Sequence, residues 1–455
     1  MINNFLVIIM TNLVISSCQN KMEQDIVVIG GGLMGSSTAW ELSLNGENVL
    51  LIEQQDSVYN FGSSFGEARV SRSLGPKNDI FSYIQQTSIV ETKKLISYLN
   101  EVSKGKLHKM EDIYSSTPVT YIYDKSQQHE VNVLLDGQND RYEYAPGPQK
   151  ALEMFDMIIP DSSMVIREYK EFSGTLNPKV LISKLHQGIK ASGNKILFNE
   201  KVTNLQKKNS HYEIEITNTK TDETRVILAK KVVSAAGPYT GTLVKDIAPY
   251  VSQLITPKRL FLAFFKMDKT TYTGFSDQQK KRLHEYYPII AEDDPDMFYS
   301  MIEKYDEDGI PILKIGGHFL RTNVENLDMV WQKELSKNEI EWSKKKTLNY
   351  FNLLNMPIDP TSLIFYKGYS CVYSVTETGI PYVTNVLDNK DNMDPNFVIV
   401  GGMSGIGAKG SLAYGLLATH LLLNKEDTTS IYLITKSALG FDRLLEDKHR
   451  IDKIN

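Results

Sequence analysis

The hydrophobic pattern of the chain is most regular between residues 25 and 53. A continuous apolar, β-branched run at residues 25–29 is typical of a strand that is buried on both faces. Apolar positions at helical spacing follow over residues 33–44, and the pattern ends at Gly46, which can adopt a left-handed helix cap. A second apolar run at residues 48–52 predicts another buried strand. The first predicted unit is therefore strand, helix, strand.

The rest of the chain shows further patterns of both kinds. The region 105–161 is polar and irregular, whereas residues 255–366 have the pattern of a second domain. We expect helices at residues 88–99, 178–193, 330–353 and 411–423, and strands at residues 119–123, 131–135, 195–198, 211–216, 224–228, 231–236, 260–265, 310–315 and 397–400.

Glycines at the junction of the first strand and its helix fit the spacing G-x-G-x-x-G as Gly30, Gly32 and Gly35. Gly30 allows a tight turn, Gly32 lets the backbone approach a pyrophosphate, and Gly35 lets the helix pack against the strand. The helix N-terminus offers free N–H groups to phosphates. Glu53, about twenty residues on, can accept hydrogen bonds from ribose hydroxyls. The pattern predicts a dinucleotide site but does not separate FAD from NAD.

Length and charge narrow the class of protein. A chain of 455 residues has room for two or three domains, and its 41% hydrophobic and 23% charged residues are typical of globular proteins. The net charge of −5 provides no basic surface of the kind that binds nucleic acid. We therefore expect no nucleic-acid partner, and we also expect no metal site.

The N-terminal residues 1–21 have the features of a signal-like segment. Residues 5–15 are apolar but too few to span a bilayer, and the Ser-Ser-Cys that follows resembles a bacterial lipobox ending on Cys18. The first four residues lack the usual Lys or Arg, and Met22 offers an alternative start. We favour a lipid anchor in the cell envelope; a cytoplasmic enzyme starting at Met22 is the alternative. If Cys18 is lipidated or absent, Cys371 is the only remaining cysteine and no intramolecular disulfide is possible.

Two arginines, Arg69 and Arg72, follow a Gly-Ser pair in residues 62–72, and their spacing predicts that both lie on one side of a helical turn. The segment resembles Gly-Ser…Gly-x-x-Arg-x-x-Arg in the monomeric sarcosine oxidase and N-methyltryptophan oxidase family of FAD enzymes. The resemblance implies that Ser63 and Arg69 lie at the flavin and that Arg72 grips a substrate carboxylate, for which an Arg fork offers paired donors. Phe65 stands where those enzymes have His.

The run from Lys314 to His318 matches the Lys-x-Gly-x-His of the same family. The resemblance implies that Lys314 lies over the flavin face opposite the substrate and promotes reaction with O2. A preorganised cation stabilises the superoxide anion that forms when O2 accepts an electron. His318 and Tyr299 occupy the places of residues that line the substrate cavity.

Cys371 and Tyr373 fall in a segment similar to the family's Cys-x-Tyr-Thr. The resemblance implies a thioether between Cys371 and the flavin 8α-methyl, with Tyr373 closing over the substrate carboxylate. This chemistry needs a thiolate and a flavin polarised by cations, for which Arg69 and Lys409 are candidates. A buried, inert cysteine is the alternative.

The last strand leads into a glycine loop with Gly405 and Gly407, and a helix follows. The resemblance implies that this loop aims a helix N-terminus at the flavin O2 edge, where negative charge gathers on reduction. Lys409 matches the family lysine that binds the substrate carboxylate beside the second arginine. By the same comparison Val202 and Gly237 belong to the cofactor site. Ile406 replaces the family's His, so the pocket is more apolar.

The motifs occur in the family's order from residue 25 to about residue 444. They imply an α/β protein with a Rossmann-type FAD-binding domain and a second, mixed β-sheet substrate domain. The predicted ranges are 22–87, 165–250 and 366–445 for the FAD-binding domain, and 88–164 and 251–365 for the substrate domain.

The expected activity is FAD-dependent oxidation of the C–N bond of an N-methyl amino acid or related amine carboxylate. O2 is the expected acceptor, and the products are H2O2 and an imine that hydrolyses to aldehyde and amine. The alternatives are an FAD-dependent amino-acid dehydrogenase that reduces a quinone or other carrier, an NAD-dependent dehydrogenase that fits only the first glycine pattern, and a non-catalytic flavin-binding protein. The partners are the amine and O2, and we take a monomer as the expected state.

Overall fold

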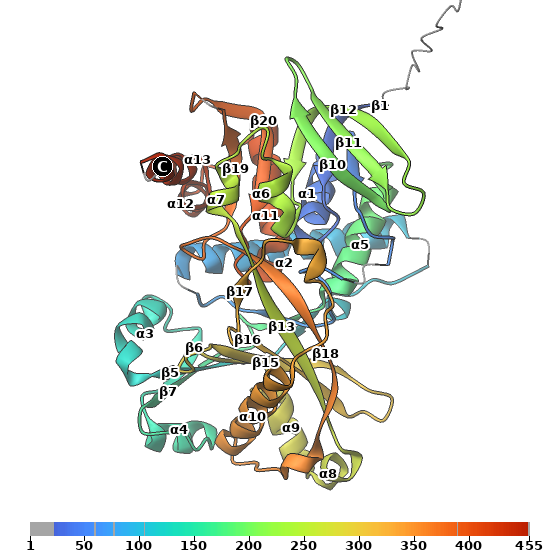
Figure 1. Cartoon of the computed structure of the whole chain (residues 1–455). Helices are drawn as coiled ribbons and strands as arrows, with labels where there is room; N and C mark the ends of the chain where they lie inside the picture. Colours follow the sequence, from blue (N-terminus) through green and yellow to red (C-terminus); the bar gives the residue numbers. More distant parts are fainter. Residues whose placement is uncertain (1–21, 59–60, 76–77, 104, 389, 454–455) are drawn as a thin grey trace, which may run out of the picture.

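The computed structural model describes residues 22–58, 61–75, 78–103, 105–388 and 390–453. The predicted signal-like segment and Cys18 lie outside the described residues, so the lipid anchor stays a prediction. None of the described helices combines the length and the apolar character needed to cross a bilayer. Two β-sheets, each with its own helices, form the two parts of the molecule (Figure 1).

The first sheet has eight strands and a parallel centre. In spatial order the parallel strands are β9 (Lys195–Leu197), β2 (Val49–Ile52), β1 (Met22–Ile29), β12 (Thr224–Ser234) and β20 (Met393–Gly401). The antiparallel strands β10 (Glu200–Lys207) and β11 (Tyr212–Asn218) extend it from β12, and β19 (Tyr382–Leu387) pairs with β20.

Both faces of this sheet are covered. Ile26 and Val28 of β1 lie in one apolar cluster, while Val27 and Ile29 lie in another on the opposite face, because successive side chains of a strand alternate. The first cluster holds α1 (Leu33–Leu44), α2 (Asn78–Val102), α5 (Pro178–Ala191) and α11 (Ser411–Leu423). The other receives α6 (Thr240–Leu243), α7 (Val251–Leu254) and α13 (Phe441–Asp452), and α12 (Ser430–Leu439) lies between α2 and α13.

The second sheet has nine strands and is mostly antiparallel. Its strands are β17 (Thr322–Asn323), β13 (Thr256–Met267), β16 (Pro311–Gly317), β15 (Phe298–Tyr305), β14 (Ile289–Ala291), β5 (Val119–Asp124), β7 (Ser163–Glu168) and β6 (Tyr142–Ala145), with β18 (Leu363–Val375) beside β13. Helices α3 (Gln128–Leu135), α4 (Pro148–Phe155), α8 (Lys269–Gly274), α9 (Asp277–Tyr286) and α10 (Lys337–Leu353) accompany it (Figure 1). A small third sheet contains β3 (Arg69–Ser71), β8 (Gly174–Leu176) and β4 (Tyr114–Ser116).

The expected α/β class is confirmed, and most predicted elements are present with adjusted ends. The strand predicted at residues 131–135 is wrong, because Val131, Leu134 and Leu135 are buried at helical spacing in α3. The two strands predicted at residues 224–228 and 231–236 form the single strand β12.

The predicted domain ranges change at three places. The boundary at residue 87 falls inside α2, whose apolar face packs against α11 and α5 and therefore joins the first sheet. The predicted boundaries after residues 164 and 365 fall inside β7 and β18, and backbone hydrogen bonds place β7 beside β5 and β18 beside β13 in the second sheet.

Candidate functional site

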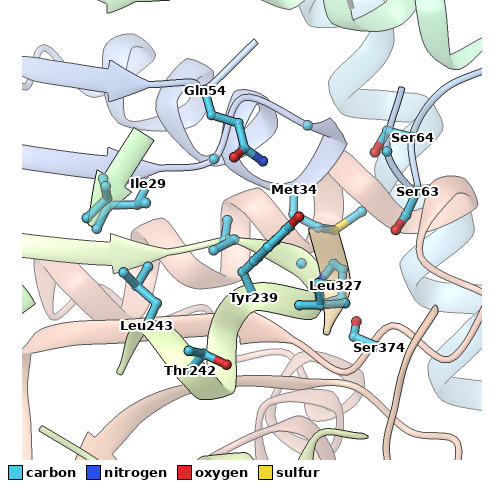
Figure 2. A pocket seen from close by; sticks show the side chains of 18 of the residues that line it. Ile29, Met34, Gln54, Ser63, Ser64, Tyr239, Thr242, Leu243, Leu327 and Ser374 are labelled. Carbon is cyan, nitrogen blue, oxygen red and sulfur yellow. The ribbon is translucent and has the colours of Figure 1, made fainter. Parts of the chain in front are cut away.

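A cavity of about 680 Å³ opens at the carboxyl ends of β1 and β2, where parallel sheets bind ligands. Figure 2 shows Met34, Ser63, Tyr239 and Ser374 around it. Segments that are far apart in the sequence, including the end of β18, therefore line the same cavity. Most predicted cofactor residues line it: Gly30, Gly32, Glu53, Ser63, Arg69, Val202, Gly237, Gly405 and Gly407, together with Tyr373. Gly35, Cys371 and Lys409 do not, and neither do Arg72, Tyr299, Lys314 and His318.

The glycine turn between β1 and α1 leaves no room for side chains. A Cβ on Gly30, whose φ is +101°, would lie 2.5 Å from the carbonyl oxygen of Ala235. A Cβ on Gly35 would lie 1.8 Å from the carbonyl oxygen of Gly30. Gly32 caps α1 and lines the cavity, so the helix N-terminus faces the space where a phosphate can accept its N–H groups.

Glu53 ends β2 and is buried at the cavity wall. Its Oε2 accepts from the N–H of Gly31 at 2.5 Å, and its Oε1 accepts from the N–H of Gln55 at 2.8 Å. Burial raises the pKa of Glu53, and these backbone donors oppose the increase. Each carboxylate oxygen has a second lone pair, which suits the hydroxyls of a ribose.

The arginine segment, residues 66–74, is extended at β3 rather than helical. The prediction that both guanidiniums share one side of a helical turn is wrong, because backbone hydrogen bonds to β8 hold the segment as a strand. Arg69 donates to the carbonyl oxygens of Phe65 and Ala68. Arg72 instead lies 5.5 Å from the centroid of the Tyr121 ring. The two arginines therefore have different surroundings.

Lys314 on β16 is fully buried and paired with Glu303 of β15. Its Nζ lies 2.5 Å from Oε2 of Glu303 and also donates to the carbonyl oxygen of Ala68. Burial lowers the pKa of Lys314 to about 8, and Glu303 opposes this effect. Burial alone would raise the pKa of Glu303, but Lys314 and Arg69 hold it below its usual value.

Lys409 is 5% exposed and lies in the 3-10 turn Ala408–Gly410 that precedes α11, with Nζ 5.1 Å from the centroid of the Phe81 ring. No residue that the structure describes forms a hydrogen bond with this ammonium. Burial and the charge of Arg72 lower the pKa of Lys409 well below its usual value, while Glu168 opposes them. Arg72, Lys409 and Glu168 therefore share one electrostatic environment.

Glu168 at the end of β7 is the third buried carboxylate of the site. Oε1 accepts from the backbone N–H of Ser73 at 2.7 Å, its hydroxyl at 2.6 Å and the N–H of Leu74 at 3.3 Å. Oε2 accepts from the hydroxyl of Tyr121 at 2.7 Å. Burial raises the pKa of Glu168.

Two tyrosines and a histidine form the remaining polar group. The hydroxyls of Tyr299 and Tyr373 lie 3.1 Å apart, and Tyr373 lines the cavity. Nε2 of His318 lies 3.1 Å from Nη1 of Arg321, and burial lowers the pKa of His318 to about 4, so the ring is neutral at pH 7. The guanidinium of Arg321 interacts electrostatically with both tyrosines.

The family model described as "DAO: FAD dependent oxidoreductase" matches residues 25–421. The chain belongs to this family.

Individual relatives are distant but match over most of their length. The chain is 22% identical to a probable sarcosine oxidase of Arabidopsis thaliana, over 88% of each chain. It is 21% identical to N-methyl-L-tryptophan oxidase of Yersinia pestis, over 90% of this chain and 98% of that enzyme.

Solved structures show the same fold. NikD, described as an unusual amino acid oxidase essential for nikkomycin biosynthesis, gives a TM-score of 0.68 at 16% identity, covering 92% of this chain and 98% of NikD. L-proline dehydrogenase from P. horikoshii gives 0.64 at 17% identity, covering 93% and 99%.

The cavity of this DAO family member fits FAD. The glycine turn admits a pyrophosphate at the N-terminus of α1, and Glu53 faces the position of a ribose. Side chains larger than hydrogen at Gly30 and Gly35 would collide with backbone atoms, so the turn is shaped for close backbone approach.

Cys371 on β18 is a free, buried thiol in an apolar cluster with Leu260, Phe264 and Tyr369. Burial raises the pKa of Cys371 to about 12, although Arg69 and other cations oppose the increase. The thiol is therefore protonated at neutral pH in this structure. The thioether to flavin stays a prediction.

Sequence reasoning missed three charged residues of the site, Glu303, Glu168 and Arg321. Glu303 sits at a buried position of β15, and Glu168 follows a buried run in β7; a charged residue inside an apolar strand is the signal that points to both. Arg321 lies three residues after His318, in a loop whose path no local pattern indicates.

We expect Gly35→Ala to abolish tight FAD binding, because its Cβ would overlap the carbonyl oxygen of Gly30. The strain corresponds to about 1–3 kcal/mol of stability. Flavin content per chain and thermal unfolding measure the two effects. Gly274→Ala is the matched control, since no atom lies within 4 Å of its added Cβ; equal flavin content in both variants would contradict this account of the turn.

Proposed function

We propose that this enzyme oxidises the C–N bond of an N-methyl amino acid or a related amine carboxylate and passes the electrons to O2. The observation that carries the proposal is the buried ammonium of Lys409, which lacks a hydrogen-bonding partner among the described residues and lies near Arg72. The carboxylate of Glu168 offsets only one of these two neighbouring buried cations, and a substrate carboxylate would balance the other.

Arg72 and Lys409 bind and orient the carboxylate in this proposal. A hydrogen bond to a charged group contributes about 1.5–3 kcal/mol, and Arg adds a fixed direction through its planar fork. Tyr373 and Tyr299, joined through their hydroxyls, close the polar side of the site. Tyr373 reaches the cavity wall, so it is the member of the pair that can contact a bound substrate.

FAD, when bound, would supply the two-electron chemistry. In the overall reaction the CH–NH group would lose two electrons and two protons, water would hydrolyse the resulting imine to aldehyde and amine, and O2 would gain two electrons and two protons to become H2O2. The chain supplies orientation and charge around this chemistry. Lys314 is the group that would stabilise negative charge developing on O2, because its ammonium is fixed before the reaction begins.

One observation favours a second candidate, a dehydrogenase with a quinone or other carrier as acceptor. Lys314 is not a free cation, because Glu303 lies 2.5 Å from its Nζ. The neighbouring carboxylate offsets part of the field that a lone lysine would exert on O2. Oxygen consumption at the rate of amine-dependent bleaching supports the oxidase; fast bleaching with slow oxygen consumption supports the dehydrogenase.

We expect Lys409→Met to raise KM for N-methyl amino acids roughly 10–150-fold, the equivalent of one charged hydrogen bond. The matching methyl esters, which lack the carboxylate charge, should be affected far less. Steady-state peroxide formation and anaerobic bleaching measure both substrate classes. Lys93→Met, at an exposed lysine of α2, is the control. An equal loss for acids and esters would show that Lys409 does not bind the carboxylate.

We expect the yellow colour of the wild-type protein to stay with the acid-precipitated pellet, and that of Cys371→Ser to move to the supernatant. The reason is that only a covalent bond survives unfolding. Absorbance of pellet and supernatant measures the distribution. Wild-type colour in the supernatant would leave FAD binding intact and show that the thioether is absent.

A further inference from the structure

The side chain of Glu303 on strand β15 binds groups from two other parts of the site. Its Oε1 accepts from the backbone N–H of Glu67 at 2.7 Å, and its Oε2 accepts from the N–H of Ala68 at 3.1 Å and from Nζ of Lys314 at 2.5 Å. The side chain comes from the second sheet, whereas residues 67 and 68 belong to the arginine segment. One carboxylate therefore joins Lys314 to the backbone that precedes Arg69.

The peptide of Ala68 is held from both sides by this ion pair. Its N–H donates to Glu303, and its carbonyl oxygen accepts from Lys314. Arg69 follows directly, lines the FAD cavity, and also donates to the carbonyl oxygen of Ala68. A displacement of Glu303 would therefore move both the lysine and the arginine.

We propose that Glu303 is a positioning residue that keeps Lys314 charged and holds Arg69 against the cofactor cavity. The proposal rests on the role of Lys314 in the reaction with O2 proposed above. Lys314, Arg69 and Glu303 together carry one net positive charge in a buried site, and within the described part of the chain Glu303 is the carboxylate that acts on this lysine. The other titratable group facing Lys314 is the thiol of Cys371.

The charge state of Lys314 links Glu303 to pH. Burial lowers the pKa of Lys314 to about 8, and Glu303 acts in the opposite direction. Removing the carboxylate charge lowers this pKa further, by about one to three pH units for a contact of this kind. The ammonium would then be lost near neutral pH, and with it the cation available to O2.

The test compares wild type, Glu303→Gln, Lys314→Met and the double variant as holoenzymes. Photoreduction supplies the reduced state without any amine, and stopped-flow absorbance follows its reaction with O2 from pH 6 to 9.5. We expect the wild-type rate to fall with a midpoint near pH 8, and the midpoint in Glu303→Gln to lie at least about one unit lower. Lys314→Met and the double variant should show neither midpoint.

Thermal unfolding over the same pH range provides a readout that does not depend on oxygen chemistry. The pKa of Lys314 is lower in the folded chain than in the unfolded one, about 8 against 10.5, so the unfolded chain binds more protons between these values. Stability from this group therefore rises with pH across that window. In Glu303→Gln the rise should begin at a lower pH, and it should be absent in Lys314→Met.

Glu307→Gln, at an exposed carboxylate four residues away, is the control and should leave both profiles unchanged. A uniform loss of rate in Glu303→Gln with unshifted midpoints would overturn the proposal, because it would indicate packing alone.

If wild type reacts slowly with O2 and Lys314→Met does not change the rate, O2 is not the acceptor, and the unfolding profiles decide the role of Glu303. If Glu303→Gln fails to fold, the double variant should recover, since it removes the buried cation that lost its ion-pair partner and leaves Arg69 as the one buried charge of the three; no recovery would overturn the proposal.

Discussion

The arginine segment runs between two buried carboxylates, and each accepts backbone hydrogen bonds from one end of it. Glu303 holds the N–H groups of residues 67 and 68, while Glu168 holds those of residues 73 and 74. Both glutamates come from the second sheet, and the segment pairs through β3 with β8. These charge-assisted bonds fix where Arg69 and Arg72 stand, because a strand only three residues long cannot hold itself in place.

Burial gives these groups their chemical character. The same desolvation that lowers the pKa of Lys314 and Lys409 strengthens every charge interaction they make. Lys314 has a carboxylate within contact distance, whereas Lys409 has no hydrogen-bonding partner among the described residues. The first arrangement suits a lysine that keeps the same ion pair throughout the reaction. The second suits a lysine that binds the carboxylate of a substrate. The two lysines are thus distinguished by their neighbours and not by their type.

Local features of the site were predictable. The glycine turn, Glu53 and the strand–helix–strand unit follow from residues within one stretch of about thirty, and the structure places them around the cavity as the spacing predicts. The helical prediction for the arginines was wrong. A spacing of three residues between Arg69 and Arg72 is compatible with a helical turn, but backbone pairing with β8, more than one hundred residues later, holds the segment as a strand. The strand predicted at residues 131–135 failed since short apolar runs do not separate the two states.

The sequence by itself determined the family, the cofactor turn and the positions of the charged residues in the chain. Only the tertiary structure decided that Glu303 pairs with Lys314 and that Glu168 lies by Tyr121. It also decided that Cys371 is buried in an apolar cluster. The physical reason is that a turn depends on backbone conformation over a few residues, whereas a pKa depends on burial and on charges brought together from distant strands.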